Sequence, residues 1–252
     1  MQRFKKQKPF NFLLAARVLF ILESDEFAKP NFYFLPKYIL LKKFARFIHF
    51  LLERKMTENA SNKMVIAIEG SIGVGKSTVL KELERRGHIV QTEPVEHWTL
   101  LHDLYKDMEK YGALFQVQVL ATYASYKPRV QFLERSAQSA RGVFSAMMYR
   151  DGYITPAQLQ TIDSVAKMIP VPAPEVFVYL EAEAELCQSR IQWRARDGEE
   201  AVELKYLRKL DAAYKDWLPS VRHFVIKVKA SDSPSVVADS ILNTLRDARL
   251  LV

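Results

Sequence analysis

From residue 64 onward, short apolar runs alternate with longer stretches in which apolar residues recur at helical spacing. Five runs rich in β-branched and aromatic residues are predicted as strands: Val65–Ile68, His88–Val90, Val130–Leu133, Val176–Leu180 and Phe224–Val228. Their near-continuous apolar character indicates strands covered on both faces, and the intervals between them are long enough for helices. The pattern predicts an α/β fold with a five-stranded parallel sheet flanked by helices.

The first 55 residues differ from the rest of the chain. Of the 37 Lys/Arg and 29 Asp/Glu, this segment holds 12 and 4, and it contains 10 of the 15 Phe. Three interpretations remain open: a mitochondrial targeting stretch, a basic amphipathic membrane-surface element, or a dispensable extension upstream of a start at Met56. The polar stretch 57–63 is the predicted boundary, so residues 1–63 form a basic extension and residues 64–252 the folded domain.

Charge and cysteine content narrow the class of protein. Residues 56–252 hold 25 basic and 25 acidic residues, so this neutral body gives no electrostatic reason to expect nucleic-acid binding. Cys187 is the only cysteine, which excludes a disulfide framework and a Cys-rich zinc site. The longest apolar stretch, Phe12–Leu22, is shorter than the roughly 18 residues a membrane span needs and contains Arg17. We expect a cytoplasmic protein, or a mitochondrial one if residues 1–55 act as a targeting segment.

A glycine-rich loop follows the first predicted strand directly and precedes a helical pattern. It matches G-x-x-x-x-G-K-[ST], in which backbone N–H groups and a helix N-terminus cradle phosphates. Lys76 is expected to reach the β- and γ-phosphates, and the Ser77 hydroxyl to bind Mg²⁺. The predicted ATP-binding loop consists of Gly70, Ser71, Ile72, Gly73, Val74, Gly75, Lys76, Ser77 and Thr78.

Charged residues follow the second and third predicted strands. Ligands bind beyond the carboxyl ends of strands in such sheets, so we expect Glu93, Glu134 and Arg135 to face the site. Glu93 is the candidate general base, although glutamates at strand ends are commonly solvated. Charges at the end of a buried strand are costly without partners, and Mg²⁺ and phosphate would supply them. The alternative is a mutual ion pair between Glu134 and Arg135.

Three arginines follow the fourth predicted strand. Arg190, Arg194 and Arg196 are predicted on one helix, with the first two on the same face because they are four residues apart. Arginine binds phosphate oxygens in a bidentate manner, but the cluster is also compatible with a solvated face paired with Glu183 and Glu185. The polar stretch 197–200 is typical of a mobile tip and suits a lid over phosphates.

Further motifs accompany the glycine-rich loop. They are Glu93-Pro94-Val95 with Trp98, Tyr105 eleven residues before Gln116, Phe115-Gln116, Glu134-Arg135-Ser136 with Ser139-Ala140-Arg141, and Arg190 through Glu199 with Lys205-Tyr206-Leu207. Taken in order, these motifs resemble the deoxyribonucleoside kinase family, which includes deoxycytidine, deoxyguanosine and mitochondrial thymidine kinases and the insect multisubstrate enzyme. The resemblance runs from about Met64 to Leu218. A thymidylate kinase shares the phosphate loop but is not expected to carry the Glu-Pro-Val and Phe-Gln elements together.

The resemblance implies phosphorylation of the 5′-hydroxyl of a deoxyribonucleoside by ATP with Mg²⁺. It implies that Glu93 takes the proton from this hydroxyl and that Arg135 holds the same end of the acceptor. It assigns Ser77 and Glu134 to Mg²⁺. The implied charges that stabilise the transferred group are those of Lys76, Arg190, Arg194 and Arg196.

The resemblance also implies contacts to the sugar, the base and the donor. Tyr105 and Glu199 are implied at the sugar 3′-hydroxyl, Gln116 at the base edge, and Asp232 in the loop where relatives hold the donor adenine. Each residue implied as a wall of the acceptor pocket could equally be plain core. These wall residues are Trp98, Leu101, Leu104, Phe115 and Phe144.

Base preference follows by analogy from two positions. Ala140 stands where relatives that prefer deoxycytidine carry an aspartate, and Val119 resembles members that use thymidine. The Gln116 amide can present a donor or an acceptor, so it can pair with thymine or cytosine. We expect thymidine first and deoxycytidine second, in a pocket narrowed by the bulk of Tyr123.

The expected partners are the deoxyribonucleoside and the triphosphate donor, and a homodimer is implied by the resemblance alone. Two other functions stay open. One is a nucleotide-sensing adaptor that binds a membrane surface or nucleic acid through the basic extension. The other is a nucleoside monophosphate kinase similar to thymidylate kinase.

Overall fold

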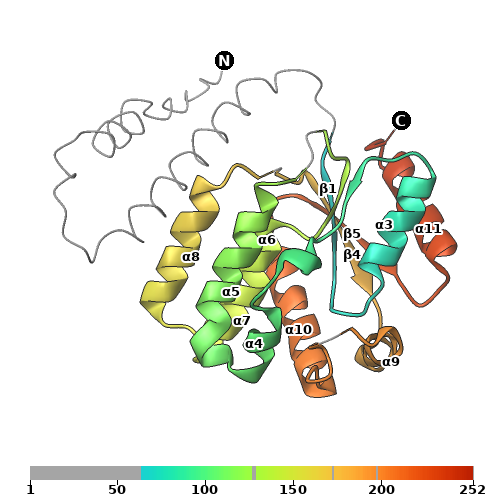
Figure 1. Cartoon of the computed structure of the whole chain (residues 1–252). Helices are drawn as coiled ribbons and strands as arrows, with labels where there is room; N and C mark the ends of the chain where they lie inside the picture. The colour runs from blue at the N-terminus through green and yellow to red at the C-terminus, as the bar shows by residue number, and fades with distance from the viewer. Residues whose placement is uncertain (1–63, 127–128, 172, 197, 252) are drawn as a thin grey trace, which may run out of the picture. The chain divides into compact units, whose positions relative to one another are not determined.

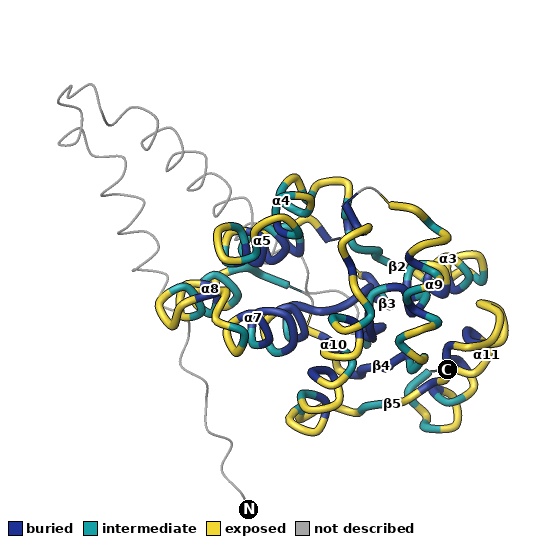
Figure 2. The backbone as a smooth tube through the Cα atoms, turned by 90° about the horizontal axis from the view of Figure 1, so that it is seen from below, coloured by how far each residue is buried: buried dark blue, intermediate teal, exposed yellow. Residues whose placement is uncertain are grey.

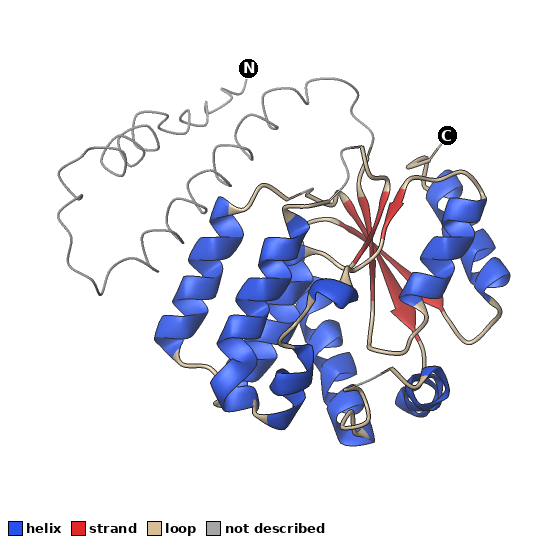
Figure 3. Ribbon diagram, viewed as in Figure 1, coloured by secondary structure: helices blue, strands red, loops and turns tan. Residues whose placement is uncertain are grey.

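Five parallel strands form one sheet in the order β2-β3-β1-β4-β5 (Figure 1, Figure 3). This computed structural model describes residues 64–126, 129–171, 173–196 and 198–251, so the predictions for residues 1–63 lie outside the described residues. All five predicted strands are confirmed, and the second and third each begin two residues later than predicted. The strands are β1 (Ile66–Glu69), β2 (Val90–Gln91), β3 (Phe132–Glu134), β4 (Val176–Glu181) and β5 (Phe224–Lys229).

Helices cover both faces of the sheet, as the apolar strands require (Figure 1). One face packs against α3 (Lys76–Arg85), α9 (Ala184–Arg194) and α11 (Pro234–Asp247). Within the described residues, none of the helices is both long and apolar enough to cross a membrane. The other helices in the described part of the chain are η2 (Val95–His97), α4 (Leu101–Lys106), α5 (Met108–Tyr123), α6 (Ala137–Ser139), the π-helix η3 (Ala140–Ser145), α7 (Ala146–Arg150), α8 (Pro156–Met168), α10 (Leu204–Trp217) and η4 (Leu218–Ser220).

Several helix starts follow from local sequence. Thr155 caps α8 by accepting from the Gln158 N–H, and Gln158 reaches back to the Thr155 N–H, while proline occupies the first helical position. Ser233 caps α11, which also begins with proline. These capping residues and prolines fix the first residue of α8 and of α11.

The strand order creates a crevice at the carboxyl end of β1. This strand pairs with β3 on one side and β4 on the other. The chain adds β2 and β3 on the first side of β1 and then crosses over to add β4 and β5 on the second. In open α/β sheets such a switch point is where ligands bind. Strands β1, β3 and β4 are buried almost throughout, as the dark tube in Figure 2 shows, whereas β5 is partly exposed. The buried acids Glu69 and Glu134 lie where β1 and β3 end. The fold thus delivers the residues after β1, β2 and β3 to one place.

Candidate active site

The loop between β1 and α3 is shaped by glycines. Gly73 has φ +78°, and a Cβ there would lie 2.3 Å from the carbonyl oxygen of Cys187 on α9. Gly75, which precedes α3, has φ +107°. Only glycine adopts such angles freely and permits this close backbone approach. The loop therefore lies tightly between β1 and α9, as a phosphate cradle requires.

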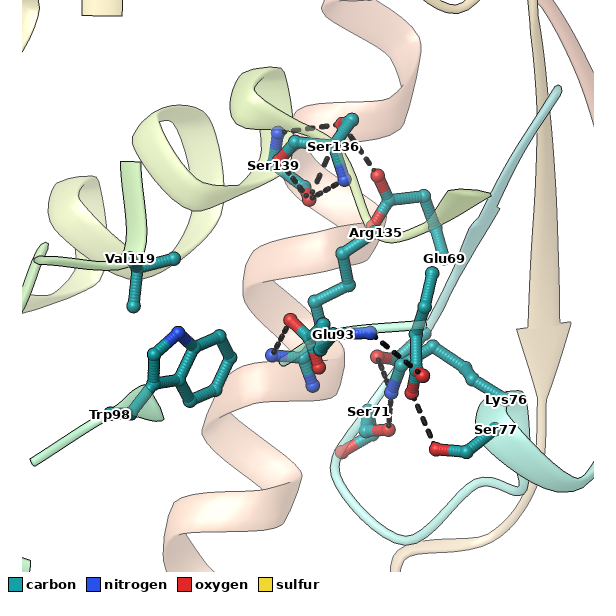
Figure 4. A network of polar contacts seen from close by, with 12 residues as sticks. Glu69, Ser71, Lys76, Ser77, Glu93, Trp98, Val119, Arg135, Ser136 and Ser139 are labelled. Atoms are coloured by element: carbon teal, nitrogen blue, oxygen red, sulfur yellow. Dashed lines mark hydrogen bonds and ion pairs between the residues drawn. The ribbon is translucent and has the colours of Figure 1, made fainter. Parts of the chain in front are cut away.

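Lys76 lies inside this loop. Its Nζ donates to the carbonyl oxygens of Gly70 at 3.2 Å and Ser71 at 2.9 Å, as Figure 4 shows for Ser71. Burial, followed by the nearby charge of Arg135, lowers the pKa of Lys76 to about 8, while Glu134 acts in the opposite direction. The ammonium is still charged at neutral pH and lies where phosphate oxygens would contact the loop.

Ser77 and Glu134 bring two oxygens together from different elements. The Ser77 Oγ donates to Glu134 Oε1 at 2.7 Å, and the backbone N–H of Glu93 donates to Glu134 Oε2 at 3.3 Å. The described residues contain no cluster of three or more His, Cys, Asp or Glu that could hold a metal. Mg²⁺ prefers oxygen ligands and is commonly held by one or two protein groups together with waters and substrate phosphates. The oxygens of Ser77 and Glu134 fit this ion.

Glu93 and Arg135 face each other across the site. Arg135 Nη1 lies 3.6 Å from Glu93 Oε1, and the two side chains are 10% and 8% exposed. The guanidinium also lies 4.5 Å from the centre of the Phe144 ring, a favourable cation–π contact. Glu134 bonds Ser77 while Arg135 pairs with Glu93, so the structure replaces the mutual ion pair with two separate partnerships.

The electrostatics of Glu93 suit a proton acceptor. Burial raises its pKa to about 7; the charge of Arg135 opposes the rise, and that of Glu134 adds to it. A general base works best when its pKa lies near the operating pH. Although glutamates at strand ends are commonly solvated, the side chain of Glu93 is only 8% exposed, and its pKa lies near neutral pH.

A cavity of about 300 Å³ opens beside this pair. In Figure 4, Trp98 and Val119 lie on one side of Glu93, and the loop residues Lys76 and Ser77 lie on the other. The structure brings every predicted acceptor-site residue to the lining of this one cavity. These residues are Glu93, Trp98, Leu101, Leu104, Tyr105, Phe115, Gln116, Val119, Tyr123, Arg135, Ala140, Phe144 and Glu199.

The part of this cavity beside α5 is lined mainly by apolar side chains, with a few polar groups among them. Buried Gln116 lies on α5 and accepts at Oε1 from Ser145 Oγ at 3.3 Å. The Tyr123 hydroxyl, one turn beyond Val119, is buried with no hydrogen-bond partner among the described residues. Ala140 begins the π-helix η3, a feature often found at functional sites. Several of these wall residues also belong to the hydrophobic core, so they both line the cavity and pack in the core.

The arginines after β4 differ from their prediction in two respects. The helix α9 ends at Arg194 because Ala195 adopts a left-handed conformation at φ 43°, so Arg196 lies beyond the helix. Glu199, expected near a free tip, is 5% exposed and holds both arginines: it accepts two bonds from Arg194 at 2.7 Å and one from Arg196 at 3.3 Å. Asp197 lies outside the described residues.

A second cavity, of about 280 Å³, borders the glycine loop and the start of α11. Arg190 joins these two parts, because Nη1 donates to the Val74 carbonyl at 2.8 Å and Nη2 to the Ala230 carbonyl at 2.9 Å. Most of the residues predicted to bind ATP line this second cavity, but Arg196 lines the first. Those lining the second are Gly73, Val74, Gly75, Lys76, Ser77, Thr78, Arg190, Arg194 and Asp232; Ile72 lines the first, and Gly70 and Ser71 hold Lys76.

Sequence reasoning missed several residues of the site. Met148 and Tyr206 line the first cavity, and burial raises the pKa of Tyr206 to about 12. The Lys-Tyr-Leu motif could have pointed to Tyr206, but no local signal marks Met148. Glu69 is fully buried at the end of β1. An acid at the end of a buried strand is the same signal that singled out Glu134, and it could have found Glu69.

The chain is similar to a family of known proteins. The family model described as deoxynucleoside kinase matches residues 66–245. The thymidine kinase of Ictalurid herpesvirus 1 is 36% identical over 197 residues, covering 72% of this chain and 86% of that protein. The deoxyadenosine/deoxycytidine kinase of Bacillus subtilis is 29% identical over 182 residues, covering 67% and 83%.

A solved structure of deoxyadenosine kinase from M. mycoides, with dCMP and dCDP bound, shares the fold at a TM-score of 0.66. It is 22% identical and covers 73% of this chain and 100% of its own.

Proposed function

Because this chain belongs to the deoxynucleoside kinase family, we propose that it transfers the γ-phosphate of ATP to the 5′-hydroxyl of thymidine, with deoxycytidine as its second acceptor. The observation that carries the proposal is the Glu93–Arg135 pair, which lies beside both the glycine loop and the acceptor cavity. A base and a cation held together there suit an acceptor hydroxyl that must lose a proton as its oxygen attacks phosphorus.

Glu93 accepts the proton of the 5′-hydroxyl. Its carboxylate is buried and has a pKa of about 7, so it is basic enough to take a proton and still largely ionised slightly above neutrality. Arg135 keeps the carboxylate oriented and donates to the acceptor oxygen. These groups lie close to the glycine loop, which supports a position for the hydroxyl near the phosphate to be transferred.

Lys76 and Arg194 hold the donor phosphates from the loop side and the α9 side. ATP supplies the phosphoryl group, and Mg²⁺ at Ser77 and Glu134 supplies charge neutralisation. The loop fits phosphates, since its glycines leave no side chain between the backbone and a ligand. Arg190 acts on this site indirectly, because its guanidinium is bonded to two carbonyl groups and holds the loop against the segment after β5.

At the sugar end, Glu199 and Tyr105 bind the 3′-hydroxyl. Glu199 is buried beside the cavity and is held by Arg194, which connects the acceptor and donor sides. Burial raises the pKa of Tyr105, so its phenol remains a neutral donor at every physiological pH. A ribose 2′-hydroxyl would require a further polar partner in this crowded region.

Thymine preference rests on the side chains around Gln116. Ala140 and Val119 are small and apolar, so they accommodate a methyl group without desolvating a polar one. Neither provides an acceptor for the amino group of cytosine. Gln116 pairs with the base edge through its amide, and the unpartnered Tyr123 hydroxyl gains a partner when a base occupies the cavity.

The test is a phosphorylation assay with ATP and Mg²⁺ across thymidine, deoxycytidine, deoxyadenosine, deoxyguanosine and thymidylate. We expect the highest kcat/KM with thymidine and release of one ADP per thymidylate formed. Fastest turnover of thymidylate would replace the proposal with a monophosphate kinase. Binding of ATP without turnover of any of the five would instead favour a nucleotide-sensing adaptor.

A further inference from the structure

Glu69, the last residue of β1, has no part in the chemistry described so far. Its side chain is 0% exposed. Burying a carboxylate costs free energy unless it is hydrogen-bonded, so the hydrogen-bond partners of Glu69 must offset this cost. Burial raises the pKa of Glu69, and its hydrogen bonds, the first of them from Ser136, act in the opposite direction.

Both carboxylate oxygens of Glu69 are used. Oε1 accepts from Ser136 Oγ at 2.6 Å, which Figure 4 shows as the link between the two side chains. Oε2 accepts from the Tyr214 hydroxyl at 3.1 Å. Ser136 follows Arg135 directly in the chain, whereas Tyr214 lies on α10. One buried side chain therefore joins the end of β1 to the turn after β3 and, separately, to a helix.

The turn that Glu69 reaches is strained. Arg135 has φ 59°, in the left-handed region that residues with a Cβ avoid. Its backbone N–H donates to the Ile68 carbonyl at 3.0 Å, and the next side chain is bonded to Glu69. Ile68 and Glu69 are consecutive in β1, so the end of this strand holds the Arg135 turn from both sides.

The Ser136 hydroxyl has two separate tasks. It accepts from the Ser139 N–H at 3.1 Å and so caps α6. Its hydrogen is directed to Glu69 Oε1. The cap alone would not require a carboxylate below it, because an N-cap serine acts through its oxygen. The bond to Glu69 thus serves the orientation of the turn.

We infer that Glu69 is a positioning residue: through Ser136 it holds Arg135 in the left-handed conformation that directs the guanidinium to Glu93 and Phe144. The inference rests on the role proposed for Arg135 at the acceptor hydroxyl. Without this tie the turn can relax to an ordinary backbone conformation, and the guanidinium moves away from the position in which it meets Glu93 at 3.6 Å.

The test uses the full chain and whichever deoxyribonucleoside the native enzyme phosphorylates fastest. Ser136→Ala removes the hydroxyl that donates to Glu69 and changes no charge. We expect kcat/KM for the acceptor to fall about 10-fold to 100-fold, the effect of a displacement on the order of 1 Å, with an unchanged KM for ATP. Ser136→Thr retains the hydroxyl and is expected to restore activity.

Substitutions at Glu69 separate this bond from the helix cap. Glu69→Met leaves the cap intact and is expected to match Ser136→Ala. Glu69→Gln keeps an oxygen for Ser136 and should stay within about threefold of the native kcat, because hydroxyl groups can rotate to suit an amide. If Glu69→Met does not fold, the Ser136→Ala and Ser136→Thr pair still decides. Native kinetics in Ser136→Ala would overturn the inference.

Tyr214→Phe is the matched control. It removes the hydrogen bond from the Tyr214 hydroxyl to Glu69 and leaves the Arg135 turn in place, so we expect a lower Tm with native kinetics. If Tyr214→Phe loses as much activity as Ser136→Ala, Glu69 has only a structural role and the inference fails.

Arg135→Ala separates this failure from that of the proposed function. Native kinetics in Arg135→Ala would overturn the role of Arg135 and the inference with it. An impaired Arg135→Ala beside a native Ser136→Ala would overturn the inference alone.

Discussion

Glu93 Oε1 and Arg135 Nη1 lie 3.6 Å apart in a pocket that excludes most water from both side chains. The two residues come from the ends of neighbouring strands, β2 and β3. Burial alone would lower the pKa of Arg135, but the charges of Glu93 and its neighbours, Glu134 and Glu69 among them, together raise it. The pair therefore combines a permanent cation with a carboxylate that titrates near neutrality.

Glu93→Gln should lower kcat by about 100-fold to 10,000-fold, the contribution of a well-placed general base. Gln keeps the size of the side chain and loses its basicity, so binding of ATP, measured by calorimetry, should remain native. Glu84→Gln, an exposed substitution on α3, provides the matched control and should leave kcat unchanged. Near-native turnover in Glu93→Gln would remove Glu93 from the mechanism.

The activity should depend on pH through Glu93. Its active form is the carboxylate, and its pKa is raised to about 7, so kcat/KM should increase as pH rises through about 7. The pKa of Lys76 is lowered to about 8, so the kcat/KM for ATP should decrease again above that value as the ammonium is lost. A profile measured from pH 5.5 to 9.5 checks both limbs. A flat acid limb down to pH 5.5 would contradict the assignment of Glu93.

Ala140→Asp should shift the preference from thymidine towards deoxycytidine. The new carboxylate can accept from the amino group of cytosine, whereas thymine offers it only a carbonyl oxygen. We expect the ratio of kcat/KM values to change by about 100-fold or more, since unpaired buried polar groups discriminate strongly. Ala140→Leu, which fills space without adding charge, should impair both acceptors alike. An unchanged ratio in Ala140→Asp would place the base elsewhere.

Tyr123→Phe should stabilise the free protein and weaken acceptor binding. The Tyr123 hydroxyl is buried without a hydrogen-bond partner among the described residues, and removing such a group recovers about 1 kcal/mol or more. A base in the cavity would satisfy this hydroxyl, so its loss should raise the KM for the acceptor. Thermal unfolding and steady-state kinetics provide the two measurements. A lower Tm in Tyr123→Phe would show that the hydroxyl already has a partner.

Trp193 should report donor binding by fluorescence. It is 89% exposed on α9 and, with Pro234 and Val237, lines the second cavity, which borders the glycine loop. A nucleotide base that stacks on the indole would shield it from water, so ATP should shift its emission to shorter wavelength. The same titration of Trp193→Phe should lose this change, while Trp217→Phe should retain it. Equal responses in both variants would assign the signal to Trp98 and separate Trp193 from the donor site.

Much of this site could be read from the sequence because the signals are local. The glycine loop and the helix after it are contiguous, and five apolar runs predicted five strands within two residues at their starts. The parallel-sheet rule then placed Glu93, Glu134 and Arg135 at one edge. Sequence also predicted the arginines after β4, but not that the helix ends before Arg196, since a left-handed Ala195 has no clear signal in its own sequence.

The partners of these side chains were decided only by the tertiary structure. Glu69 and Ser136 are 67 residues apart in the chain, and Arg190 and Val74 are 116 apart. Spacing within a helix or strand constrains neighbours over a few residues, whereas contacts at these separations depend on strand order and on which helix covers which face. The sequence by itself determined which groups reach the crevice. The fold decided which of them meet, because only packing brings distant carboxylates, hydroxyls and guanidinium groups within hydrogen-bonding distance.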